Sequence, residues 1–136
     1  MADISDVKVG QEIPTLTKFV GLTEMVAYAA ATWDFHRYHY DAEFAKSLGM
    51  PGPIVDGQMF GAYLAQMLLL WGGPNAFIKK MSIRYKSLVQ AGEEVVCWGR
   101  IEEVDPDART VTIEMGVRGA DGRDVLAPGS AVVELG

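Results

Sequence analysis

Both histidines of the chain and three of its aspartates lie between Trp33 and Gln58. Two of these side chains, Asp34 and His39, are five positions apart. That separation does not place them on one face of a straight helix, but across a turn it can bring a carboxylate and an imidazole to the same water molecule. Such a pair can take a proton from water and return one to a neighbouring carbon, which makes this stretch the candidate site.

A second chemical feature follows directly in the chain. An apolar helix is expected to begin at Gly57, where its first backbone N–H groups have no partner within the helix. Together with the positive end of the helix dipole, these groups suit a carbonyl oxygen that gains negative charge during a reaction. Asp56 is a good N-cap for this helix, and capping is compatible with the oxyanion role. A carboxylate and an imidazole beside such an oxyanion site form a device for adding or removing water next to a thioester carbonyl.

The segments before the site are expected to position Asp34. A strand is predicted over about residues 14–20, followed by a helix with Thr23 as its N-cap and Glu24 in its first turn. This alanine-rich helix delivers Asp34 at its C-terminal end. A second short helix is predicted over residues 41–48, with Asp41 as N-cap and Gly49 as its stop.

The segment after the loop is the most apolar of the chain. Two prolines and a glycine make residues 50–56 a loop, and a helix is predicted from Gly57 to Trp71. Its apolar residues cover most of its circumference, so we expect it to be buried on nearly all sides. At about 15 residues it is too short to span a membrane comfortably.

From Asn75 onward the hydrophobic period is two, in segments 77–89, 94–104, 110–118 and 124–135. The separators are short and turn-like, which predicts antiparallel neighbours. The third segment alternates cleanly and should have one wet side, whereas residues 95–101 suggest burial on both faces. One domain over residues 1–136 is expected, of class α+β: a curved antiparallel sheet of about five strands wrapped around the long helix, which is the hot-dog fold.

Two motifs in the candidate site resemble those of the MaoC-like, or hydratase-2, family. The first family motif is Asp, any residue, Asn, Pro, an aliphatic residue and His; residues 34–39 keep the Asp and the His but not the Asn and Pro. The second is Pro-Ile-x-His-Gly after a glycine; here residues 53–57 read Pro-Ile-Val-Asp-Gly, with Asp56 in the place of the His. The element order of most of the chain is also similar to that of the family.

The resemblance implies a hydratase that adds water to 2-enoyl thioesters, R-specifically and without a metal or redox cofactor, with enoyl-CoA as the expected substrate. It implies that Asp34 and His39 are the catalytic pair and that the Gly57 amide holds the thioester oxygen. The missing Asn ordinarily helps to order the catalytic loop, and Asp56 adds a carboxylate that could repel an enolate. The altered motifs are also similar to those of hydratase subunits of steroid side-chain degradation, which act as hetero-oligomers.

Further residues are candidates for substrate binding, although each also has a structural reading as an N-cap, a core side chain or a solvated face. The basic ones are included because a CoA tail carries phosphates. These candidates are His36, Tyr38, Asp56, Gln58, Met59, Tyr63, Lys79, Lys80 and Arg84.

Composition limits the partners. The net charge of −6 and a pI near 4.8 disfavour nucleic acid or an anionic membrane as the main partner. The single cysteine, Cys97, allows no internal disulfide, and the N-terminus lacks the pattern of a signal peptide, so a cytoplasmic protein is expected. The apolar fraction of 49% favours a subunit interface. We therefore expect a homodimer, or a hetero-oligomer with another hot-dog subunit.

Two alternatives stay open from the sequence. A hot-dog thioesterase would use a carboxylate-activated water on the same thioester and release free CoA. A non-catalytic hot-dog subunit would instead complete the substrate tunnel of a partner; the loss of the motif Asn and His favours this reading, whereas the retention of Asp34 and His39 argues against it.

Overall fold

The computed structural model describes residues 1–136, and the expected order of one strand, two helices, a loop, a long helix and four strands is confirmed. A short 3-10 helix, η1, is added to that order. The elements are β1 (Glu12–Val20), α1 (Leu22–Thr32), η1 (Arg37–His39), α2 (Ala42–Ser47), α3 (Gly57–Gly72), β2 (Phe77–Ser82), β3 (Glu93–Asp105), β4 (Thr110–Gly119) and β5 (Asp124–Glu134).

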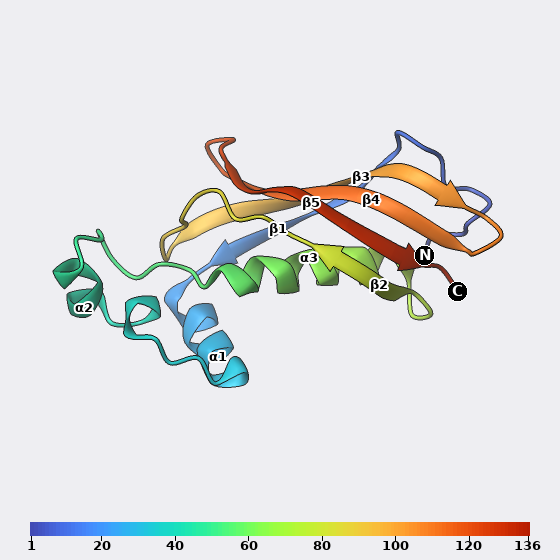
Figure 1. Cartoon of the computed structure of the whole chain (residues 1–136). Helices are drawn as coiled ribbons and strands as arrows, with labels where there is room; N and C mark the ends of the chain where they lie inside the picture. Colours follow the sequence, from blue (N-terminus) through green and yellow to red (C-terminus); the bar gives the residue numbers. More distant parts are fainter.

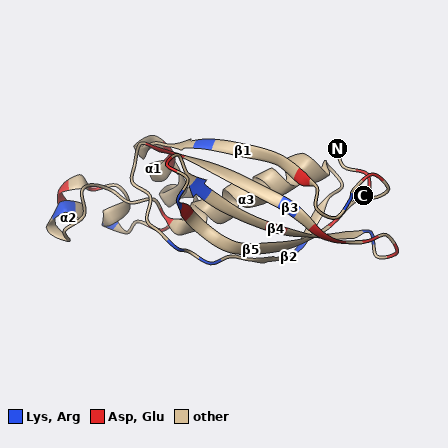
Figure 2. Cartoon of the chain, turned by 90° about the horizontal axis from the view of Figure 1, so that it is seen from above, with Lys and Arg blue, Asp and Glu red and all other residues tan.

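The five strands form one antiparallel sheet in the order β1-β3-β4-β5-β2, and its concave face covers α3 (Figures 1 and 2). Leu64, Met67 and Leu68 of α3 are fully buried in a core cluster of 22 residues. Each such side chain contributes roughly 1.5–3 kcal/mol when it leaves water, so helix and sheet stabilise one another. The expected hot-dog architecture is confirmed. In Figure 1, α1 lies below one end of the sheet, beside the start of α3, and η1 and α2 lie past that end.

The prediction that segments 77–89 and 94–104 are neighbours is wrong. The strand β2 ends at Ser82 and pairs with β5, at the opposite edge of the sheet from the β1–β3 pair. Residues 83–92 form no strand and pass the N-terminal end of α3 before β3 begins. Isolated bridges pair Tyr85 with Leu126 of β5 and Gln90 with Ile54. Residues 83–92, here called the crossover segment, carry the chain from one edge of the sheet to the other. The strands β2 and β3 are therefore not hydrogen-bonded to each other, although the turn-like separator between them is short.

The strand β3 is buried on one face only, so the expectation of burial on both faces is also wrong. Val95, Cys97 and Ile101 are buried on the side that faces α3, while Val96 and Trp98 on the other face are partly exposed. Burial raises the pKa of the Cys97 thiol to about 12.

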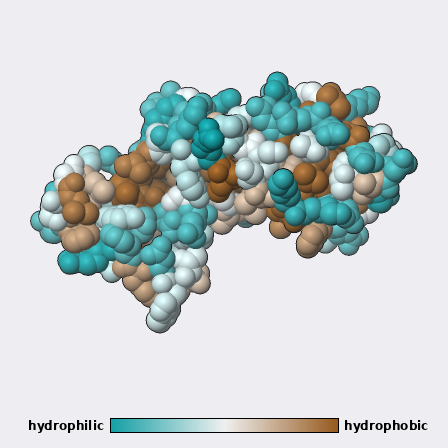
Figure 3. Space-filling view, viewed as in Figure 1, coloured by the Kyte–Doolittle hydropathy of each residue, from teal (hydrophilic) through white to brown (hydrophobic).

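The helix α3 has one exposed apolar side, which departs from the expectation of burial nearly all round. Leu69 is 43% exposed and Leu70 is 65% exposed, and the neighbouring edge strand β2 leaves Phe77 65% exposed. An apolar groove along α3 continues this surface, between Ala62 and Ala76. Figure 3 shows hydrophobic patches interrupted by hydrophilic side chains on the face seen in Figure 1. Such a surface on a small domain is typical of a subunit interface.

The helix caps agree with the sequence at two of three sites. Asp41 caps α2 and Asp56 caps α3, each by accepting a backbone N–H. Thr23 is not a cap, because α1 begins at Leu22. The N-cap position is Gly21, which has no side chain to form a capping hydrogen bond. None of the helices combines the length and the apolar character that crossing a bilayer requires.

Candidate active site

Asp34 is placed by a left-handed turn at the end of α1. Trp33 has a φ of 57°, and its backbone N–H donates to the carbonyls of Ala29 and Ala30. The Asp34 N–H then donates to the Ala29 carbonyl over 3.0 Å. A left-handed residue other than glycine costs roughly 1–2 kcal/mol, so these bonds maintain a strained turn directly before the candidate acid.

His39 lies in η1 and is only 6% exposed. Its Nδ1 is 2.7 Å from the Ile54 carbonyl oxygen. Since a carbonyl only accepts hydrogen bonds, Nδ1 carries the hydrogen and Nε2 is left for chemistry. A backbone carbonyl therefore sets both the tautomer and the orientation of the ring.

The loop that supplies this carbonyl is held on both sides. The Ile54 N–H donates to the Tyr38 carbonyl over 3.0 Å, and the Val55 N–H donates to the Val89 carbonyl over 2.8 Å. Ile54 also forms an isolated bridge with Gln90. The orientation of His39 thus depends on the crossover segment that sequence reasoning took for a strand.

At the start of α3, Asp56 Oδ1 accepts the Gln58 N–H over 2.9 Å. Gly57 is the first helical residue, and its N–H has no carbonyl within the helix to bind. A Cβ atom on Gly57 would lie 2.9 Å from Cε1 of Tyr85, so the Tyr85 ring packs directly on the glycine backbone. A side chain at residue 57 would therefore have to displace the Tyr85 ring.

The three polar side chains converge. One carboxylate oxygen of Asp34, one ring nitrogen of His39 and one carboxylate oxygen of Asp56 all lie within 4.8 Å of one another. They line a cavity of about 430 Å³ together with Gly57. A carboxylate and an imidazole that can exchange protons therefore lie beside a helix N-terminus in one cavity, an arrangement that suits addition of water next to a carbonyl. Two carboxylates and an imidazole could also hold a divalent cation.

Burial raises the pKa of Tyr85, which lines the cavity, and the negative charge of Asp56 raises it further. Burial also raises the pKa of Tyr28. The charge of Asp56 raises that pKa further, and Tyr85 adds to it. Both hydroxyls therefore keep their protons at neutral pH and can donate hydrogen bonds.

Six of the residues singled out in the sequence line the cavity: Asp34, Tyr38, His39, Asp56, Gly57 and Gln58. The lining also includes seven that sequence reasoning did not assign to the site: Ile54, Val55, Phe60, Tyr85, Ser87, Leu88 and Val89. Four of these seven come from the crossover segment. No local pattern in that segment marks them, because long-range contacts bring them to the cavity: Tyr85 and Ser87 bond to β5, and Val89 bonds to Val55.

The other six candidates lie outside the cavity lining: His36, Met59, Tyr63, Lys79, Lys80 and Arg84. The exposed His36 ring lies against Tyr38, with 3.7 Å between the ring centroids and 41° between the ring planes, so it touches a lining residue. Met59 is in the core, and Lys79 pairs with Glu134 over 2.9 Å at the sheet edge. Their roles in substrate binding stay predictions.

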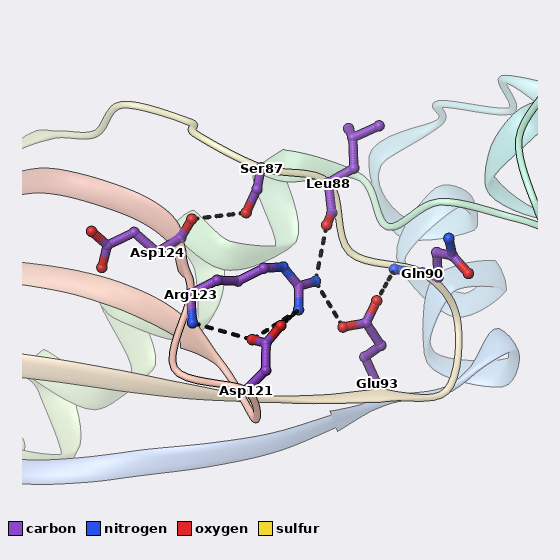
Figure 4. A network of polar contacts seen from close by, with 7 residues as sticks. All are labelled: Ser87, Leu88, Gln90, Glu93, Asp121, Arg123 and Asp124. Atoms are coloured by element: carbon purple, nitrogen blue, oxygen red, sulfur yellow. Dashed lines mark hydrogen bonds and ion pairs between the residues drawn. The ribbon is translucent and has the colours of Figure 1, made fainter.

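The crossover wall of the cavity is tied down by Arg123, in the turn between β4 and β5 (Figure 4). Its guanidinium donates to the Leu88 carbonyl over 3.1 Å, to Glu93 over 2.7 Å and to Asp121 over 3.1 Å. Ser87 Oγ donates to the Asp124 carbonyl over 2.8 Å. The Arg123 cluster therefore positions the crossover segment, which in turn holds the loop that orients His39.

This cluster predicts a loss of stability in acid. Burial alone would raise the pKa of Glu93, but the Gln90 N–H and the Arg123 guanidinium outweigh it and lower that pKa below its usual 4.5. The stabilisation is therefore present above about pH 4.5 and is lost as the pH falls through the lowered pKa. We expect Arg123→Gln to reduce the free energy of unfolding by about 1 kcal/mol at pH 7. The difference from the wild type should shrink toward pH 3, as measured by urea denaturation across that range.

Arg100→Gln is the matched control, because Arg100 pairs with Glu114 over 2.7 Å on the sheet, outside this cavity. It should leave any turnover at the candidate site unchanged, whereas Arg123→Gln should also reduce that turnover. Equal turnover in both variants would mean that Arg123 does not position the cavity wall.

Comparison with known proteins gives consistent matches. Residues 5–120 match the family model described as "MaoC like domain". Over 132 residues the chain is 30% identical to the (R)-specific enoyl-CoA hydratase of Aeromonas caviae, and the match covers 94% of this chain and 95% of that protein. The solved structure of the (R)-hydratase from A. caviae involved in PHA biosynthesis superimposes with a TM-score of 0.90 at 27% identity, covering 96% and 98% of the two chains.

A chain of the ChsH1-ChsH2 complex from Mycobacterium tuberculosis superimposes with a TM-score of 0.85, covering 95% of this chain and 98% of that one. At 24% identity, this likeness shows the shared fold.

Proposed function

Because the chain belongs to the MaoC-like domain family, we propose that it is a hydro-lyase that reversibly adds water across the 2,3 double bond of an enoyl thioester, R-specifically and with enoyl-CoA as substrate. The observation that carries this proposal is the convergence of Asp34, His39 and the start of α3 on one cavity. The relative that covers nearly the whole chain is named for the same reaction.

In the proposed reaction, the Gly57 N–H donates a hydrogen bond to the thioester carbonyl oxygen. A water oxygen forms a bond to C3 while its proton passes to the Asp34–His39 pair, and the electrons of the double bond move toward C2 and the carbonyl oxygen. C2 then takes a proton from the same pair on the same face, which is syn addition. One water is consumed and no electrons are exchanged, so the steps need only groups of the chain and the substrate.

The direct test is to follow the enoyl absorbance of crotonyl-CoA and of longer or ring-bearing enoyl-CoA substrates, with the thiol measured in parallel. Loss of absorbance without thiol release, and formation of the (R)-3-hydroxyacyl product, supports the proposal. Thiol release would instead indicate the thioesterase alternative. The panel of substrates also addresses chain length and ring systems, and carrier-protein thioesters can be added to it.

The assembly is part of the proposal. The exposed apolar side of α3 and the open edge at β2 support a dimer of this chain or a pair with another hot-dog subunit; one structural neighbour is itself described as a complex of two subunits. Light scattering of the purified chain, followed by identification of any co-purifying subunit, distinguishes the two. A cytoplasmic location remains a prediction.

We expect activity to survive chelation, because the proposed steps use only side chains, a backbone N–H and water. Dialysis against EDTA should leave turnover within about twofold of the untreated protein. Added Zn²⁺ should inhibit, since Asp34, His39 and Asp56 offer it three ligand atoms in the place of the water. Loss of activity after chelation, restored by a metal, would instead make the three residues a metal centre.

A further inference from the structure

The two carboxylate oxygens of Asp56 have different surroundings. Oδ1 is bonded to the Gln58 N–H and caps α3. Oδ2 is buried and accepts no hydrogen bond from any group of the chain. It is one of only two buried side-chain polar atoms in the protein that lack a partner. Capping accounts for one oxygen of this residue and leaves the other unexplained.

Asp56 also stands where the second family motif has a histidine. It lines the cavity, and one of its oxygens belongs to the cluster with Asp34 and His39 within 4.8 Å. A buried carboxylate oxygen needs a donor, and leaving one without a partner costs roughly 1–3 kcal/mol or more. The charge of Asp56 raises the pKa values of Tyr28 and Tyr85, but neither hydroxyl donates a hydrogen bond to Asp56 Oδ2.

We propose that Asp56 Oδ2 is a third catalytic group, which binds the reacting water beside Asp34 and His39 by accepting one of its hydrogens. The inference rests on the proposed hydration. A water molecule has two hydrogens and two lone pairs, and one lone pair must face C3 for the addition to occur. When the Asp34–His39 pair accepts one hydrogen and Asp56 accepts the other, the remaining lone pairs have fixed directions, and one of them is held toward the substrate.

Asp56 also determines what the site recognises. After the addition, the 3-hydroxyl oxygen of the product occupies the place of the water, and its single hydrogen can be accepted by a carboxylate. The site therefore favours a thioester with a hydroxyl at C3 over the saturated thioester of the same length. The bond from the Gln58 N–H to Oδ1 offsets part of the charge that would otherwise oppose the enolate oxygen at Gly57.

The test is Asp56→Asn. Asparagine caps helices as well as aspartate does, so the fold and the start of α3 are kept, while the free acceptor is replaced by an amide. We expect kcat for crotonyl-CoA hydration to fall roughly 10- to 100-fold. In calorimetry, (R)-3-hydroxybutyryl-CoA should bind roughly tenfold more weakly, whereas butyryl-CoA should bind with unchanged affinity, because only the former has the hydroxyl.

The matched control is Asp41→Asn, which changes the N-cap of α2, where Asp41 Oδ1 accepts the Phe44 N–H over 3.0 Å outside the cavity. It should leave turnover and both affinities unchanged. If Asp56→Asn also does so, Asp56 is only a cap and the inference is wrong. If the variant weakens both thioesters equally, its effect is on the thioester end and the inference is again wrong. If the wild-type protein binds neither thioester, the proposed function itself fails, which is a different result.

Discussion

Replacement of His39 by alanine is expected to lower hydratase turnover by about 10²- to 10⁴-fold, the range that a positioned acid–base group contributes. The ring is nearly fully buried and is held by the Ile54 carbonyl, so its only free nitrogen is Nε2. Removing it leaves Asp34 without its partner for proton exchange with water. Steady-state kinetics with crotonyl-CoA, together with circular dichroism to check the fold, measures the effect.

The His39→Ala variant also distinguishes an enzyme from the alternative of a non-catalytic subunit. His36→Ala is the control, because His36 is the other histidine of the chain and its exposed ring lies outside the cavity lining. Its turnover should stay within a few-fold of the wild type. A His39→Ala protein that remains fully active, alone or with a co-purified partner, would show that the reaction takes place at another subunit's residues.

The second large effect is expected from removal of the Gly57 N–H. Proline suits the first position of a helix and lacks only this donor. Asp56 already has φ −62° and ψ 122°, the extended backbone that a residue before proline requires. Loss of one oxyanion donor lowers kcat by roughly 10²- to 10³-fold, and we expect a decrease of that size for Gly57→Pro.

The comparison has to be made in a Tyr85→Ala background, because the three atoms closest to a Cβ at residue 57 all belong to the Tyr85 ring. In that background, Gly57→Ala adds a side chain but keeps the N–H, and Gly57→Pro removes it. A large difference in kcat between the two assigns the effect to the hydrogen bond. Similar activities would mean that the Gly57 amide does not hold the thioester oxygen.

Local chemistry was sufficient to predict most of the elements. The alternation in residues 110–115, the glycine and proline punctuation around residues 49–57 and the capping side chains of Asp41 and Asp56 each act within a few residues, and each gave the correct element. Asp34 and His39 could be paired in the same way because a single turn separates them.

What could not be predicted depends on contacts between distant segments. Residues 83–89 have the alternation of a strand, but they form only scattered backbone bonds to β5 before Val89 pairs with Val55. The neighbours of β2 and the Tyr85 wall of the cavity were therefore both missed. The exposed side of α3 is equally invisible in the sequence. Leu69 and Leu70 are as apolar as the buried Leu64 and Leu68. Only the extent of the sheet determines which leucines of α3 are buried.

Cys97, the single cysteine, is completely buried in β3, and its raised pKa keeps the thiol protonated at neutral pH. A thiol reagent should therefore not label the native protein. Colour that develops when such a reagent is used to look for released CoA must come from the substrate. In the absence of substrate, slow labelling of one sulfur per chain would report how often the core between the sheet and α3 opens to solvent, with no engineered probe.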